Sequence, residues 1–190
     1  MQSQARALGP TIGGSALICF DTQPGQYAFF SWHNVTILVW PNSATGASVE
    51  RLGMHYREML KRDPKAQSHI HLVKAGAGLP TREARAGFVK IMHEFENDLA
   101  AVGVCLLGSG FWASAIQGAV TGMRMLAPRS FEMHIHNDLE SLIPWLPNEH
   151  RLRTGVALSP DHLLAALNTA FAEGTRTPSR GPQRSSVAAR

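Results

Sequence analysis

Residues 100–146 constrain the fold more than any other part of the chain. They open with the nearly unbroken apolar run Ala101–Leu107, which is typical of a strand covered on both faces. The turn Gly108–Gly110 follows, and apolar residues then recur at helical spacing over Phe111–Met125. Alternation of apolar and polar residues returns over Phe131–His136. This order is a βαβ unit, so the sequence predicts an α/β fold with parallel strands joined by crossover helices.

The residues before this unit predict a hairpin and further strands and helices. Ala16–Asp21 and Tyr27–Trp32 lie on either side of a Pro-Gly turn, which favours a hairpin. The apolar run Val35–Trp40 predicts another strand, whose pairing the sequence leaves open. Further expected elements are a helix from residue 48 to 60, a strand over His69–Val73 and a helix capped by Thr81 that continues to Leu99. The predicted fold is therefore a mixed sheet, with an N-terminal hairpin and then parallel strands, flanked by helices.

Two helices are expected after the last strand. The first covers residues 139–146, capped by Asn137 or Asp138 and kept short by prolines. The second covers about residues 160–172, behind a Ser-Pro-Asp start signal. The predicted organisation is a flexible leader over residues 1–14, a single α/β domain over 15–173 and a disordered basic tail over 174–190.

The positive charge of the chain is concentrated in this tail. The formal net charge is +4, and residues 174–190 hold four arginines and no acid, so the remaining residues sum to about zero. Hydrophobic residues make up 44% and charged residues 17%, as in a globular protein. The charge therefore does not point to a specific nucleic-acid surface. The tail either attracts anionic partners weakly or keeps the protein in solution.

The cysteine content and the hydropathy of the chain indicate in which cellular compartment it belongs. Cys19 and Cys105 both lie in apolar strand candidates, so we expect buried free thiols. No apolar run approaches the roughly 18 residues of a membrane span, and no secretory signal is visible. We therefore expect a cytoplasmic protein without a membrane span.

The order of the elements resembles the STAS domain of anti-sigma-factor antagonists, and in particular its stand-alone SpoIIAA-like branch. Ala101–Val104, the early Trp112, the strand Phe131–His136 and the pair Trp145-Leu146 carry the likeness. That branch commonly shows an AVVG strand, a helix with an early Trp, another strand and a helix that ends in WL. The likeness covers roughly residues 15–150. It implies protein–protein switching and the carriage of apolar ligands, without a shared catalytic reaction.

The chain departs from this family at one place. Anti-sigma antagonists carry a phosphorylatable Ser in an acid-x-Ser context just after the central strand, whereas Lys74–Thr81 contains no such context. Thr81 is the nearby hydroxyl, and a helix cap explains it without phosphorylation. A phosphate on Thr81 would lie at the positive end of a helix, which is physically favourable.

Two glycine turns form the candidate ligand or partner site. Each follows a strand and opens a helix, so both are expected at the carboxyl edge of the sheet, where α/β proteins usually bind ligands. Exposed amides there suit an anion. The same glycines also suit plain tight turns, and neither turn matches a nucleotide fingerprint. The candidate residues are Lys74, Gly76, Gly78, Thr81, Gly108, Ser109, Gly110, Phe111 and Trp112.

Other chemistry-bearing residues give weaker patterns. His69 and His71 share one face of a strand, as do His134 and His136, but the predicted strand around Val104 lies between the pairs, so we predict no metal site.

No nucleophile has an assignable base and acid, and no cofactor motif is present. A small hydrolase or transferase would need a polar triad assembled by the fold. Trp32 and Trp112 are candidates to flank an apolar groove.

The sequence therefore predicts a non-catalytic regulatory module of STAS-like type that binds a protein partner. The alternative is a carrier or sensor of a small apolar or anionic ligand, bound at the carboxyl edge of the sheet. Neither function requires a cofactor, and a homo-oligomer is left open.

Overall fold

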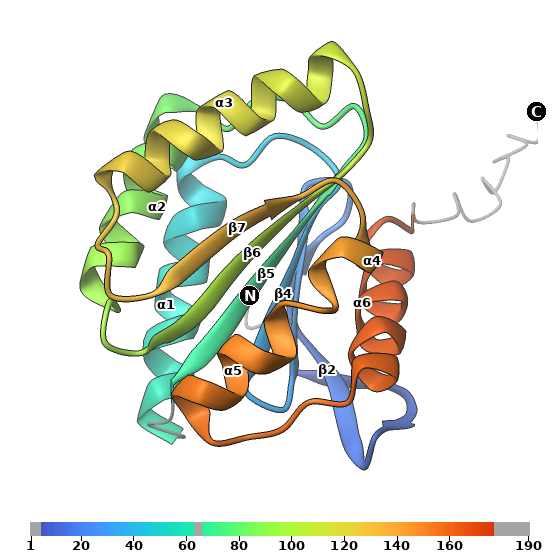
Figure 1. The fold of residues 1–190 in the computed structure, drawn as a ribbon. Coiled ribbons are helices and arrows are strands. Elements are labelled where there is room, and N and C mark those ends of the chain that lie inside the picture. The colour runs from blue at the N-terminus through green and yellow to red at the C-terminus, as the bar shows by residue number, and fades with distance from the viewer. Residues whose placement is uncertain (1–4, 63–65, 177–190) are drawn as a thin grey trace, which may run out of the picture.

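A computed structural model of the chain describes residues 5–62 and 66–176. A seven-stranded mixed sheet forms its centre, with the strands side by side in chain order (Figure 1). The strands are β1 (Arg6–Ile12), β2 (Ser15–Gln23), β3 (Tyr27–Trp32), β4 (Val35–Trp40), β5 (Gln67–Lys74), β6 (Leu99–Leu107) and β7 (Glu132–His136). Pairing is antiparallel from β1 to β4 and parallel from β4 to β7. The predicted α/β class with a mixed sheet is confirmed.

Helices cover both faces of the sheet. Helices α1 (Gly46–Arg62), α2 (Arg82–Glu94) and α3 (Phe111–Leu126) lie on one face, and α4 (Leu139–Leu142), α5 (Leu146–Thr154) and α6 (Pro160–Gly174) lie on the other (Figure 1). Two hydrophobic cores result, one on each side of the sheet. Because β5 and β6 lie between both layers, most residues of β5 and all but the last residue of β6 are buried.

The central prediction about strand order is correct. β5, β6 and β7 run parallel, with β6 between the other two. Ile70 of β5 aligns with Gly103 of β6, which aligns with His134 of β7. The strand whose pairing the sequence left open, β4, joins the antiparallel and parallel halves of the sheet.

The helix limits follow capping and proline chemistry. Thr81 caps α2 as predicted, its Oγ1 accepting from the Ala84 amide at 3.1 Å. Asp138 caps α4, its Oδ1 accepting from the Ser141 amide at 2.7 Å. The single helix predicted over residues 139–146 is wrong, because the structure has α4 over Leu139–Leu142 and a separate helix, α5, from Leu146. Pro147 lies in the first turn of α5, where a missing N–H costs nothing.

The prediction of a flexible leader over residues 1–14 is wrong for residues 6–12, and its first four residues lie outside the described part of the chain. Residues 6–12 form β1, paired antiparallel with β2, and Leu8 is buried in the core on the α4–α6 side. Pairing with β2 over Arg6–Leu8 outweighs the local preference of Gly9-Pro10 for irregular structure. The basic tail predicted for residues 174–190 lies outside the described residues from 177 onward.

A buried carboxylate anchors α1 to the hairpin. Oδ2 of Asp21, in β2, accepts from Arg51 Nε at 3.0 Å and lies 3.2 Å from His55 Nε2. It also accepts from the Tyr27 hydroxyl at 3.3 Å. Asp21 is 2% exposed, so these contacts compensate the cost of burying its charge. This cluster therefore has a structural role, because it fixes the position of α1 over the sheet.

Glycines divide sharply between packed and open positions. A Cβ at Gly103 would lie 2.8 Å from Leu142 Cδ1 and 3.1 Å from Ile70 Cδ1, so β6 and α4 approach closely there. Gly118 and Gly122 on α3 have open space around the Cβ position. The row of Ser114, Gly118 and Gly122 therefore faces solvent.

We expect Gly103→Ala to lower the free energy of unfolding by about 1–3 kcal/mol, because the added methyl group overpacks the core. The matched control Gly118→Ala should raise it by about 0.5–1 kcal/mol, because an exposed helical glycine loses more entropy on folding than alanine. Urea denaturation of both variants measures the difference. Equal effects of the two substitutions would contradict the packing of α4 on β6.

Candidate functional site

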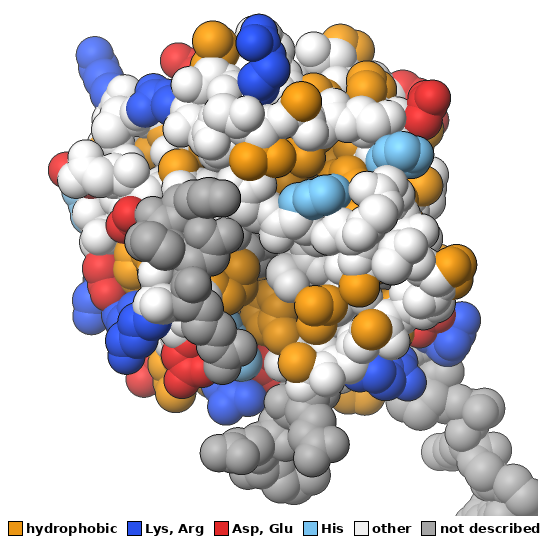
Figure 2. Space-filling view, turned by 90° about the horizontal axis from the view of Figure 1, so that it is seen from below, with side chains coloured by type: hydrophobic (Ala, Val, Ile, Leu, Met, Phe, Trp, Pro, Cys, Tyr) orange, Lys and Arg blue, Asp and Glu red, His pale blue; other side chains and the backbone are white. Residues whose placement is uncertain are grey.

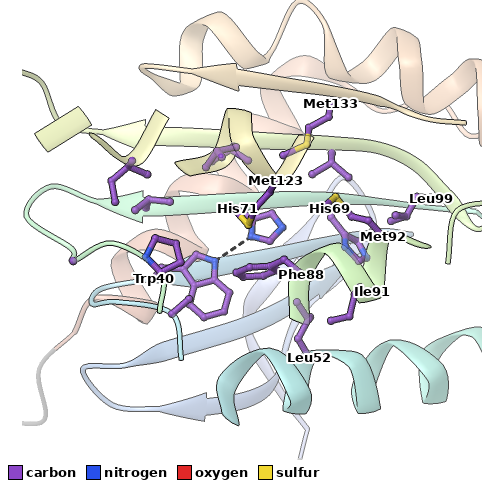
Figure 3. Close-up of a pocket in the computed structure, with 18 of the residues that line it drawn as sticks. Trp40, Leu52, His69, His71, Phe88, Ile91, Met92, Leu99, Met123 and Met133 are labelled. Carbon is purple, nitrogen blue, oxygen red and sulfur yellow. Dashed lines mark hydrogen bonds between the residues drawn. The ribbon is translucent and has the colours of Figure 1, made fainter. Parts of the chain in front are cut away.

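A cavity of about 70 Å³ lies between the sheet and helices α1–α3 (Figure 3). Strands β4 to β7 form its floor, and α1 contributes Leu52. Helices α2 and α3 supply the remaining roof residues, which are Phe88, Ile91, Met92, Ile116, Val120 and Met123. Since nearly every side chain around it is apolar or aromatic, the cavity suits an apolar occupant.

One end of the cavity reaches the carboxyl edge of the parallel strands. Asn42 and Ala44, in the loop after β4, and Gly78 and Pro80, in the loop after β5, line this end. Asn42 and Gly78 are exposed to solvent, so the cavity approaches the surface there. The loops at the carboxyl ends of parallel strands are where α/β folds usually bind ligands.

Two histidines of β5 face this cavity. Trp40 Nε1 donates a hydrogen bond to Nδ1 of His71 at 3.2 Å, and the two rings are stacked at an interplanar angle of 10° (Figure 3). Burial lowers the pKa of His71 to about 4, so the ring is neutral at pH 7. Because indole N–H is only a donor, Nδ1 of His71 accepts, and the ring proton is carried on Nε2.

His69 lies deeper on the same face. It is 3% exposed and packs edge-on against Tyr56, with ring centroids 4.4 Å apart. Burial, with a smaller effect of His71, lowers the pKa of His69 to about 3. Its Nε2 is buried and has no hydrogen-bond partner among the described residues. A buried polar atom without a partner costs about 1–3 kcal/mol, which makes this atom a candidate contact for a ligand.

The candidate residues predicted from the first glycine turn have different environments. Lys74 and Gly76 are exposed at the end of β5, and Gly76 has a φ of +80°, which a glycine adopts without strain. Gly78 lines the cavity. Thr81 is engaged as the cap of α2.

The fold brings the second glycine turn beside the first. A Cβ at Gly108 would lie 2.9 Å from the Cβ of Ala75 and 2.7 Å from the ring of Trp112. Trp112 Nε1 donates to the carbonyl of Ala77, which ties the start of α3 to the first turn. Close packing therefore explains Gly108. Of the other candidates here, Ser109 and Gly110 are exposed, and Phe111 is 90% exposed.

Trp32 and Trp112 do not flank a common groove. Trp32 is 1% exposed in the core on the α4–α6 side, where its Nε1 donates to the Ile12 carbonyl at 3.0 Å. Trp112 packs on the opposite side of the sheet. The groove hypothesis is therefore wrong.

The two histidine pairs lie on opposite faces of the sheet. His69 and His71 face α1–α3, whereas His134 and His136 pack with Trp145 on the other face, His134 at 4.4 Å between ring centroids. The described part of the chain contains no group of three or more His, Cys, Asp or Glu side chains that would hold a metal ion.

The fold assembles one polar triad, which sequence inspection missed. The Ser68 hydroxyl lies 2.8 Å from Nδ1 of His150, and Nε2 of His150 lies 2.9 Å from Oδ1 of Asn34. Burial lowers the pKa of His150 to about 4, so the ring donates one hydrogen bond and accepts the other. Ser68 and His150 are fully buried and do not line the cavity, so a substrate does not reach the hydroxyl. The triad locks α5 onto β5.

The described surface gives no sign of a charged binding face on the side drawn in Figure 2. Acidic and basic side chains are interspersed around its rim, with hydrophobic and neutral groups between them. Within the described ranges, no helix has both the length and the apolar character that crossing a bilayer requires. Of the glycine turns, the histidine pairs, the buried triad and the cavity, the cavity is the one whose lining suits an apolar ligand.

The comparisons with known proteins returned no relatives: no protein-family model matches the chain, and neither does any curated protein or solved structure.

The buried histidines make stability depend on pH. In the unfolded chain they protonate near pH 6.5, whereas in the folded chain the pKa values of His69 and His71 are about 3 and 4. The contribution of these two histidines to the free energy of unfolding is therefore fully present above pH 6.5 and is lost as the pH falls toward 4. We expect each histidine to contribute a loss of about 1.4 kcal/mol per pH unit over that window.

Urea denaturation of the His71→Phe variant between pH 7.5 and 4.5 measures this contribution. The slope of the unfolding free energy against pH should be shallower than in the wild type by about 1.4 kcal/mol per pH unit. The control Ile91→Val lowers stability by about 1 kcal/mol and should leave the slope unchanged. An unchanged slope in His71→Phe would show that His71 is not buried as a neutral ring.

Proposed function

We propose that the protein is a non-catalytic binding module that carries or senses a small apolar ligand in the cavity between the sheet and helices α1–α3. The observation that carries this proposal is an apolar cavity that contains a buried imidazole nitrogen without a partner, Nε2 of His69. Protein interiors are otherwise closely packed, and such polar atoms are rare in them.

The size of the cavity supports a small ligand. A single water needs about 10–15 Å³, and an engineered apolar cavity of about 150 Å³ accepts benzene. The volume here, about 70 Å³, lies between these values. Met92, Met123 and Met133 line the cavity, and methionine side chains adapt their shape to an occupant at low cost.

The position of the cavity supports the same proposal. Its end at Asn42 and Gly78 lies at the carboxyl edge of the sheet, which is where the sequence predicts that a carrier would bind its ligand. The lining residues include no Lys or Arg, and His69 and His71 are neutral at pH 7. An apolar ligand therefore suits this site better than an anionic one.

Filling the cavity should abolish binding without unfolding the protein. In Val120→Phe the new ring points from α3 into the cavity, whereas Thr121→Phe places the same ring on the exposed side of that helix. We expect an apolar probe such as benzene to raise the melting temperature of the wild type and of Thr121→Phe, but not that of Val120→Phe. Calorimetry at several benzene concentrations measures the shift.

Two outcomes would contradict the proposal. One is the absence of a melting-temperature shift in the wild type at saturating benzene, and the other is an equal shift in Val120→Phe. Native mass spectrometry of freshly purified protein adds an independent measurement, because a resident ligand increases the mass of the wild type and of Thr121→Phe but not that of Val120→Phe.

The second candidate is a regulatory, protein-binding role of STAS-like type. The specific observation in its favour is the 90% exposure of Phe111, a large apolar residue at the start of α3 beside two glycine turns. Exposed aromatic residues are common anchors of protein interfaces. The STAS-like arrangement itself rests on the order of strands and helices and on the motifs around Trp112.

Affinity capture tests this candidate at a single side chain. Phe111→Ser should remove a partner that wild-type protein recovers from an extract of the native cell, with a decrease of at least about tenfold if the ring is an anchor. The control Met54→Ser changes an exposed apolar residue of α1, which is 51% exposed, and should retain the partner. Identical recovery with Phe111→Ser and wild type would contradict this candidate.

A further inference from the structure

The polar atoms of the cavity indicate the chemistry of its ligand. We infer that the ligand is an uncharged apolar molecule with one oxygen acceptor, such as a ketone, ester or ether, held by the Nε2–H of His71. This inference rests on the proposed function, because it requires the cavity to be a binding site.

The donor is fixed by Trp40. Its Nε1 donates to Nδ1 of His71 at 3.2 Å, so a neutral His71 carries its proton on Nε2. No described residue accepts a hydrogen bond from this Nε2, and His71 lines the cavity. The cavity therefore presents a donor whose natural complement is an acceptor on the ligand.

His69 supplies a second polar contact deeper in the cavity. Its Nε2 is buried and unpartnered, and the ring is 3% exposed. The remaining neighbours around both rings are apolar or aromatic, among them Phe88, Ile91 and Met92 (Figure 3). The ligand must therefore place its polar group toward β5 and its hydrocarbon part toward the helices.

A carboxylate does not fit this environment. Burying a carboxylate without a counter-charge is strongly unfavourable, and no Lys or Arg side chain lines the cavity. An imidazolium would provide a charge, but burial lowers the pKa of His71 to about 4. The site therefore favours a neutral ligand over a fatty acid anion of the same size.

A soft metal ion is the alternative that the lining suggests, because three methionines and two histidines surround the cavity. Coordination through Nε2 of His71 would need a free lone pair on that atom. The hydrogen bond from Trp40 places a proton there instead. The geometry therefore favours a hydrogen-bonded organic ligand over copper(I).

A pair of probes of similar shape isolates the proposed hydrogen bond. Cyclopentanone carries the acceptor and methylcyclopentane lacks it, and NMR titration gives the dissociation constant of each for the wild type and for His71→Phe. We expect His71→Phe to raise the dissociation constant of cyclopentanone by a factor at least about three times larger than the factor for methylcyclopentane. Trp40→Phe should also weaken the binding of cyclopentanone more than that of methylcyclopentane, because His71 is then free to move its proton to Nδ1.

Controls separate the possible failures. His134→Phe, on the opposite face of the sheet, should leave both affinities unchanged, and melting curves verify that every variant is folded. Failure of both probes to bind the wild type would overturn the proposed function and this inference together. Equal effects of His71→Phe on the two probes, tighter binding of cyclopentanecarboxylate than of cyclopentanone at pH 7, or copper(I) coordination by His71 would overturn this inference alone.

Discussion

The burial of β5 on both of its faces is the constraint on which the rest of the structure depends. Ile70 and Leu72 pack toward α4–α6, so the alternate residues His69 and His71 must face α1–α3. An imidazole in such a place is tolerated when it is neutral and its nitrogens have partners. Trp40 provides a partner for one nitrogen of His71, whereas Nε2 of His69 has none within the described ranges. The site thus follows directly from the central position of one strand.

The same sheet position explains why a cavity persists. Three helices meet over β5 and β6, and the side chains between them leave about 70 Å³ unfilled. Filling that space with larger apolar residues would add contacts and stability, so the cavity and the unpartnered His69 both lower the stability of the fold. Local departures from good packing and full hydrogen bonding are expected at functional or strained sites. This is the physical reason to propose a binding function for this part of the molecule rather than for the buried Ser68–His150 pair.

Much of the fold was predictable because its signals are local. Apolar runs and helical spacing identify β5, β6 and β7 and their crossover helices, and the order of the last three strands follows from the βαβ rule. β1 was missed because Gly9 and Pro10 favour irregular structure locally, while pairing with β2 is decided by the whole sheet. The sequence predicts a site at the glycine turns, but the cavity depends on side chains from seven elements, which no local pattern reveals. The one sequence pattern that points to the cavity is the alternation that places His69 and His71 on the same face of β5.

The protonation state of His71 tests the central claim most directly. Long-range ¹H–¹⁵N correlation spectra of the ¹⁵N-labelled protein report which ring nitrogen carries the proton. We expect a neutral ring with its proton on Nε2 from about pH 8 down to about pH 5, because burial lowers the pKa of His71 to about 4. A ring that is protonated on Nδ1, or that becomes an imidazolium near pH 6.5, would contradict the hydrogen bond from Trp40 to His71 and the binding site proposed on it.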